Sequence, residues 1–311
     1  MQHCTVAGSE SVESGHMRKL NLSATFIALF GLILSVSGAM AQTKTVSKTA
    51  QPILNTTTSS KKIPQRLEAK AWSIPINFEM ASSVHEHSAY ERSAQEILNI
   101  APNYKINSQW GLGALATIYR DDSNGESGHG QSGVGNTLVS VGHSQSMTPT
   151  TTWKNKLSGT LATDVSLRDT TSFQGAVRVG SGVSFTNLWN GSSFSYMLSF
   201  NRNVHEFDMT AVGGFNIRET VGNTVDFNLP IYGPLSLQTN FNYTLGQTYK
   251  DDMRTKFSFN VGLGYDFAKN FSASVGTSNE ANALGYNGRD SNIEFFNSNT
   301  SVISFGLTYI L

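Results

Sequence analysis

The sequence predicts an all-β fold, an up-and-down antiparallel transmembrane β-barrel of about 12 strands. Three observations predict it: an export signal near the start, apolar residues with a period of two from Trp72 onward, and connections that alternate between short and long. The stretch FSFNVGLGYDFAKNFSASVG at 257–276 shows the period most clearly. Large apolar residues alternate there with small or polar ones, which gives a strand one apolar and one polar face.

The first 41 residues contain the three parts of a secretory signal peptide. A basic start, MRK at 17–19, precedes the apolar run TFIALFGLILSV, and AMA at 39–41 fits the small-residue cleavage pattern. The apolar run is too short for a good membrane-spanning helix. We therefore predict a signal peptide over 1–41, in which 1–16 are an over-extended start. Its removal takes away Cys4, the only cysteine, so no disulfide is expected.

Residues 42–69 have no sustained period and are rich in Thr, Ser and Lys. This composition predicts a disordered periplasmic tether, and we assign the barrel to 70–311. The whole chain has 22 basic and 22 acidic residues, and 14% of its residues are charged. A nucleic-acid partner is not expected, because such proteins are usually strongly basic.

Twelve strands are predicted in order, each approximate at its ends. They run over 70–82, 94–106, 108–121, 134–147, 154–168, 171–186, 193–208, 219–231, 235–249, 253–267, 270–280 and 298–311. The second is the least regular because it contains Pro102. It is retained because its end resembles the tight turn at 266–270, and because single-chain bacterial barrels have even strand numbers. No segment from Trp72 onward predicts an amphipathic helix.

The connections differ in length at the two ends of the predicted barrel. Those near 107, 148–153, 187–192, 232–234 and 268–269 are mostly short, whereas those at 83–93, 122–133, 209–218 and 281–297 are longer. The connections at 169–170 and 250–252 break this trend by being brief. Short periplasmic turns and long outer loops are typical of outer-membrane barrels.

The side chains of each strand divide into two faces. In 154–168 the lipid-facing residues are predicted to be Leu157, Leu161, Val165 and Leu167, and the inward ones Ser158, Thr160, Asp164 and Arg168. A soluble sandwich also alternates, but its polar face meets bulk water and carries more Lys and Glu.

All four tryptophans fall at or beside the predicted periplasmic strand ends: Trp72, Trp110, Trp153 and Trp189. An indole ring, apolar with one N–H, suits the boundary between lipid and water. These four residues therefore predict an aromatic girdle.

The last residues, NTSVISFGLTYIL, alternate up to the terminus. They resemble the C-terminal strand of bacterial outer-membrane β-barrel proteins of the porin-like class, which the barrel assembly machinery recognises. Members of that class usually end in Phe or Trp, whereas this chain ends in Leu311. The resemblance implies an outer-membrane location, contact with its lipid and lipopolysaccharide, and assembly by that machinery. Twelve-stranded members include sugar-acid channels, a nucleoside channel and a phospholipase, so the function stays open.

The predicted inner face is dominated by Ser, Thr, Gly and Asn, which leave room for water. The charged pore-lining candidates are Glu79, Lys105, Asp164, Arg168, Arg178, Asp226, Lys256 and Asp266, four of each sign. A balanced set suits neutral or zwitterionic solutes, or internal ion pairs that close the lumen. The segment 281–297 or the tether is a candidate plug.

Three motifs are candidate sites of chemistry or binding. His143 and Ser144 are adjacent on a strand and face opposite ways, so His143 is not expected to activate Ser144. The GxGxxG match at 128–133 lies in a loop and lacks the strand and helix of a nucleotide site. His85 and His87 alone make a weak metal site. We predict no catalytic residue, metal or cofactor.

The leading expectation is a small porin-like channel in the outer membrane of a Gram-negative-type cell, for passive diffusion of small hydrophilic solutes. The alternative is a non-conducting surface barrel whose loops bind a partner or have a structural role. A barrel-embedded lipid hydrolase is third.

Overall fold

The computed structural model describes residues 71–84, 94–121, 131–284, 290–297 and 300–311. Most of these residues lie in strands: β1 (Trp72–Ser73), β2 (Pro75–Ser83), β3 (Ala94–Ile100), β4 (Asn103–Lys105), β5 (Trp110–Asp121), β6 (Gln131–Val134), β7 (Thr137–Ser146), β8 (Thr151–Leu161), β9 (Phe173–Phe185), β10 (Ser193–His205), β11 (Ile217–Tyr232), β12 (Leu235–Thr248), β13 (Met253–Ala268), β14 (Phe271–Asn282) and β15 (Ser301–Ile310). A short helix, α2 (Val165–Thr171), follows β8. In these ranges no helix has the length and apolar character needed to cross a membrane.

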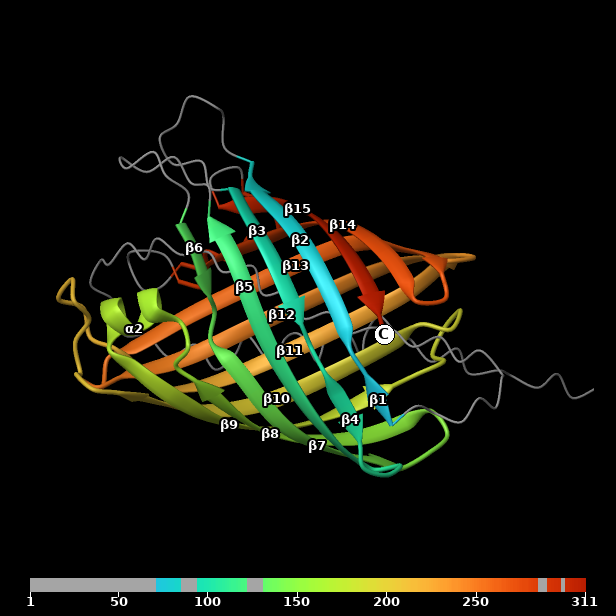
Figure 1. Ribbon diagram of the computed structural model, residues 1–311, viewed down its shortest axis with the longest axis horizontal. Helices are drawn as coiled ribbons and strands as arrows, with labels where there is room; N and C mark the ends of the chain where they lie inside the picture. Colours follow the sequence, from blue (N-terminus) through green and yellow to red (C-terminus); the bar gives the residue numbers. More distant parts are fainter. Residues whose placement is uncertain (1–70, 85–93, 122–130, 285–289, 298–299) are drawn as a thin grey trace, which may run out of the picture. The chain divides into compact units, whose positions relative to one another are not determined.

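The strands form one closed antiparallel barrel of twelve strands, as predicted. Three barrel strands are each interrupted once: β1 and β2 form the first, β3 and β4 the second, and β6 and β7 the fourth. From β7 onward each strand pairs with the next along the chain, and β15 pairs with β2 to close the sheet (Figure 1). A closed sheet leaves no unpaired edge, which is what a backbone inside a bilayer requires.

The least regular predicted strand, 94–106, is confirmed as β3 and β4. Both parts pair with β5 in one continuous register, for example Asn99 with Thr117 and Asn103 with Gly113. The break falls at Pro102, because proline has no N–H to donate to the ladder. The Pro102 carbonyl still accepts a hydrogen bond from the backbone N–H of β5, at 2.9 Å.

The predicted strand over 154–168 is wrong at its C-terminal end. Strand β8 ends at Leu161, and Val165 and Leu167 lie in helix α2 instead. Asp164 caps this helix by accepting a hydrogen bond from the Leu167 backbone N–H at 3.0 Å. A carboxylate that satisfies a free N–H of the first turn favours the helix over a continued strand.

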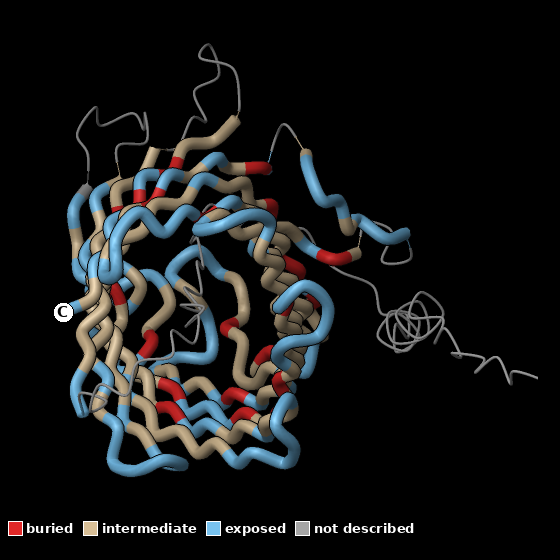
Figure 2. The backbone as a smooth tube through the Cα atoms, turned by 90° about the vertical axis from the view of Figure 1, so that its right-hand side faces the viewer, coloured by how far each residue is buried: buried red, intermediate tan, exposed pale blue. Residues whose placement is uncertain are grey.

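The two faces of the barrel wall differ in accessibility. On β2, Phe78 and Met80 are 37% and 48% exposed, whereas Asn77 and Glu79 are 3% and 1% exposed. Cross-strand partners share a face, and the register carries this division around the ring of strands seen in Figure 2. Large apolar residues face outward on every long strand, as predicted: Leu112, Val139, Leu157, Val179, Leu198, Phe200, Leu263, Val275 and Phe305 are each 42–54% exposed.

The connections follow the predicted alternation, with one correction. Short turns at 106–109, 147–150, 186–192, 233–234 and 269–270 lie at one end. At the other end, the connection predicted to be brief at 169–170 is the longer segment 162–172, which contains α2. The C-terminal residue lies at the short-turn end, where the Leu311 N–H donates to the Ile74 carbonyl at 3.2 Å.

The described part of the candidate plug 281–297 does not enter the lumen. Residues 290–297 lie against the outer face, where the Phe295 ring contacts outward-facing Phe259 with centroids 4.8 Å apart. Asn279 pairs with Phe259 on the same face and donates its side-chain N–H to the Glu294 carbonyl at 2.6 Å. The plug interpretation is therefore wrong for residues 290–297, whereas 285–289 lie outside the described residues.

Candidate functional site

The candidate site is the inner wall of the barrel. Six of the eight predicted pore-lining residues lie on it: Glu79 on β2, Lys105 on β4, Arg178 on β9, Asp226 on β11, and Lys256 and Asp266 on β13. Each is opposite another inward-facing residue, as Lys256 is opposite Thr244 and Asn282. Their contact with a passing solute stays a prediction.

Asp164 and Arg168 do not lie on a strand, so the predicted strand that placed them on the wall is wrong there, and their role as pore-lining residues stays a prediction. Asp164 is the N-terminal cap of α2, and its backbone N–H donates to the Asn136 side-chain oxygen at 3.1 Å. Arg168 lies within α2, where its guanidinium is 3.8 Å from the Asp169 carboxylate. The error follows from the strand that was extended through α2.

Five further charged residues on the inner wall were missed. Lys154 and Lys156 on β8 are opposite Gly182 and Gly180 of β9. Both could have been predicted from the sequence, because residues two and four positions before inward-facing Ser158 on the same strand also face inward. The complete inner set has six basic and five acidic residues in the described strands: Lys105, Lys154, Lys156, Arg178, Arg254 and Lys256, against Glu79, Asp121, Asp226, Asp266 and Glu280.

A network of amide and hydroxyl groups lines the wall at β10–β13. Asp226 accepts hydrogen bonds from the Ser195 hydroxyl at 3.0 Å and from the Asn240 amide at 2.6 Å. Asn242 donates to the Asn240 oxygen at 2.6 Å and accepts from the Thr224 hydroxyl at 2.7 Å. This wall presents small, mutually satisfied polar groups, which a water-filled lumen tolerates well.

Water reaches one side of the inner wall and not another. The inward side chains of Lys156, Arg178 and Lys256 are exposed although they lie inside the closed sheet. On β2 and β3, by contrast, inward-facing Glu79 and Ile97 are 1% and 4% exposed. The exposed charges show open space beside β8, β9 and β13, and the buried residues show that the wall at β2–β3 is covered.

The four tryptophans lie at the end of the barrel that carries the short turns. Trp72 begins β1, Trp110 begins β5, Trp153 is the third residue of β8, and Trp189 lies in the turn after β9. Their exposed fractions run from 42% to 70%. Their common end agrees with the predicted positions, and their role as an aromatic girdle stays a prediction.

Of the three sequence motifs for other chemistry, His143 and Ser144 lie fully within the described residues. His143 faces outward opposite Trp110, with ring centroids 4.7 Å apart, and Ser144 pairs with inward-facing Lys154. The two residues thus occupy opposite faces, as expected. Among the described residues no cluster of His, Cys, Asp and Glu is suited to a metal ion. The pair His85 and His87 lies outside the described residues, as do 128–130 of the GxGxxG match.

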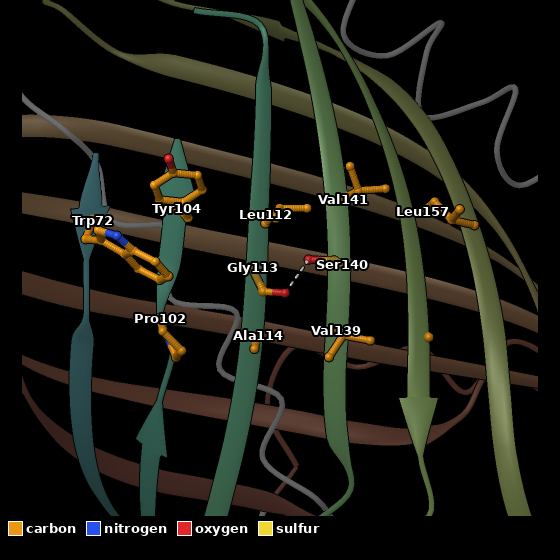
Figure 3. Close-up of a pocket in the computed structure, with 11 residues that line it drawn as sticks. Trp72, Pro102, Tyr104, Leu112, Gly113, Ala114, Val139, Ser140, Val141 and Leu157 are labelled. Atoms are coloured by element: carbon orange, nitrogen blue, oxygen red, sulfur yellow. Dashed lines mark hydrogen bonds between the residues drawn. The ribbon is translucent and has the colours of Figure 1, made fainter. Parts of the chain in front are cut away.

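An apolar groove of about 740 Å³ lies on the outer wall, near the interruption of β3 and β4. Figure 3 shows side chains from β1, β4, β5, β7 and β8 along it, among them Trp72, Pro102, Leu112 and Leu157. These residues belong to the outward face, so the groove is separate from the lumen. Its apolar lining suits contact with acyl chains.

No protein-family model matches the chain, and no curated protein matches it. Among solved structures, it is similar to the COG4313 outer membrane channel from Pseudomonas putida F1, with a TM-score of 0.57 and 13% sequence identity. That match covers 78% of this chain and 95% of the other. The NanC porin gives a TM-score of 0.47 and the KdgM porin 0.43, each at 11% identity over 76% of this chain and 98% of the other.

The likeness to the Pseudomonas putida channel shows a shared fold. The predicted resemblance to outer-membrane barrels of the porin-like class is confirmed at that level. At 13% identity nothing about the solute is carried over.

Proposed function

We propose that the protein is an outer-membrane channel through which small hydrophilic solutes diffuse passively. The observation that carries the proposal is that Lys156, Arg178 and Lys256 face inward and yet are exposed to water. Charged groups inside a membrane protein mark an aqueous path, because ions are costly to bury in apolar surroundings. The shared fold with a solved outer-membrane channel supports the same function.

A location in the outer membrane is part of this proposal. The outward face carries exposed Leu, Val and Phe on most of the long strands, and lipid is the solvent that suits such a face. Lipid and lipopolysaccharide are the proposed surroundings, after export by the signal peptide and insertion by the barrel assembly machinery. The proposal contains no catalytic step.

Single-channel recording in planar lipid bilayers tests the proposal. The purified protein is expected to give discrete conductance steps in KCl, and vesicles that contain it are expected to swell in small sugars. Heat-dependent gel mobility shows whether the purified protein is folded. If the folded protein gives neither conductance steps nor vesicle swelling, the proposed channel function is contradicted.

The alternative, a non-conducting barrel, is favoured by the covered wall at β2–β3. Asn77, Glu79, Ala81 and Ile97 face inward there and are each at most 7% exposed. If this cover extended across the whole lumen, the recordings would show no steps. The exposed cations at β8 and β9 favour the conducting form.

A further inference from the structure

We propose that Lys154, Lys156 and Arg178, termed the cationic patch, bind small organic anions with two or more carboxylates inside the lumen. The patch lies on the inner wall of β8 and β9. The inference rests on the proposed function, because it names the class of solute that the channel takes. The proposed anionic solute differs from the neutral or zwitterionic solutes expected from the eight pore-lining candidates. Those candidates do not include Lys154 and Lys156.

The pairing of β8 with β9 brings the three side chains together. Lys154 and Lys156 are two residues apart on β8, so they leave the same face about 7 Å apart. Arg178 is opposite Ser158, which makes it a diagonal neighbour of Lys156 at about 7–8 Å. Lys156 and Arg178 repel each other electrostatically. Their long side chains can reach one shared ligand from these positions.

None of the described carboxylates neutralises the cationic patch. No acidic side chain in the described part of the chain forms an ion pair with any of its three residues. Some other cations of the barrel do have acidic partners: Arg202 pairs with Glu219, and Lys256 interacts with Glu280. An internal ion pair that closes the lumen would place a carboxylate beside Lys156, and none of the described residues does so.

The inner wall beside the cationic patch carries two glycines, which have no side chain. Gly142 of β7 is opposite Lys156, Gly111 of β5 is opposite Gly142, and Lys105 of β4 is opposite Gly111. A Cβ atom at Gly142 would meet nothing nearer than 3.9 Å, and one at Gly111 nothing nearer than 3.5 Å. Packing against the described residues does not require glycine at either position, so these residues leave the row between Lys105 and Lys156 open for a ligand.

The number of unpaired charges points to a polyvalent anion. Three cations within about 8 Å of their neighbours repel one another, and each negative charge placed between them reduces that repulsion. One carboxylate leaves two positive charges unmatched, whereas a dicarboxylate leaves one. Arginine also presents a planar fork that matches carboxylate geometry.

Ion selectivity and current block in planar bilayers test the inference. In a KCl gradient the channel is expected to prefer Cl⁻ to K⁺, and succinate is expected to block the current at lower concentrations than acetate. K156Q/R178Q is expected to lose the Cl⁻ preference and to need at least about tenfold more succinate for half-block, since the loss of even one of its two charge-assisted contacts corresponds to about tenfold. Lys156→Arg keeps the charge and is expected to retain both properties. Lys269→Gln, a matched loss of charge in the short turn after β13, is expected to behave like the wild type.

The outcomes separate the patch from the channel. A current whose selectivity and succinate block are unchanged in K156Q/R178Q overturns the patch and leaves the channel standing. Absence of current in every variant overturns the channel, and calorimetry of succinate with the detergent-solubilised protein then decides. Binding that K156Q/R178Q loses supports the patch, whereas equal binding or none overturns it. Heat-dependent gel mobility establishes that each variant is folded.

Discussion

Replacing Val179 by arginine tests whether the outward face meets hydrocarbon. Val179 is the seventh of the thirteen residues of β9 and is 54% exposed. Its cross-strand neighbours Leu157 and Phe200 are also exposed on the outward face, at 48% and 46%. Val179 is six residues from either end of β9. At a rise of about 3.3 Å per residue and a strand tilt of about 40°, this separation corresponds to about 15 Å along the bilayer normal. That is half of a hydrocarbon core of about 30 Å, so the residue is predicted to lie at the bilayer midplane.

An arginine at the midplane of a barrel costs about 2–4 kcal/mol, and the cost falls to about 0–1 kcal/mol near the interfaces. We therefore expect Val179→Arg to lower the free energy of unfolding by about 2–4 kcal/mol, or roughly 30- to 1,000-fold in the folding equilibrium. Urea-dependent unfolding in lipid vesicles, followed by tryptophan fluorescence, measures this change.

The matched control is Val179→Leu, which keeps an apolar side chain at the same position and is expected to cost less than about 1.5 kcal/mol. Equal unfolding midpoints for the arginine and leucine variants would refute a lipid-facing position for Val179. All other residues are assigned to the outward or inward face from the same cross-strand pairing. That result would therefore also contradict the assignment of the inner-wall residues.

Two further substitutions test local features of the wall. A Cβ atom at Gly182 would overlap the Tyr196 carbonyl oxygen of β10, whereas a Cβ atom at Gly142 has room. In the same urea assay, Gly182→Val is therefore expected to lower the free energy of unfolding by at least about 1–3 kcal/mol, and Gly142→Ala to leave it almost unchanged. Equal costs for the two substitutions would contradict the close approach of β9 and β10. Asn279→Val removes one of the hydrogen bonds that hold 290–297 on the outer face, at a cost of about 1.4 kcal/mol. Cleavage there by a Glu-specific protease in intact vesicles is therefore expected to rise about tenfold. An unchanged cleavage rate would argue against that anchor.

The strand pattern was predictable because one physical constraint acts on the whole barrel. Lipid on one side and small polar groups on the other impose a period of two on each strand. The interrupted strand through Pro102 is the exception, because it was predicted from its turn-like end and from the even strand number of such barrels. The same rule failed at Val165 and Leu167, which continue the alternation for only two apolar positions. There the Asp164 cap, a contact within one turn of helix, outweighs the alternation.

The candidate site was predictable only in part. Lys154 and Lys156 follow from the period of two once Ser158 is placed inward, so their omission was not forced by the sequence. The outer position of 290–297 depends on a contact between Phe295 and Phe259, which are far apart in the chain. Burial of Glu79 likewise depends on what covers the wall at β2, and alternation carries no information about that.

The near balance of six basic and five acidic residues on the inner wall of the described strands does not predict a solute without net charge. Twelve strands spaced about 4.8 Å apart and tilted by about 40° give about 24 Å between opposite backbones. Charges in water are screened over about 8 Å at physiological ionic strength, so the two sides of such a lumen act separately on a small solute. A solute beside β8 and β9 therefore experiences Lys154, Lys156 and Arg178, while Glu79 is buried on the other side of the ring. The arrangement of the charges, rather than their sum, decides which ions the wall attracts.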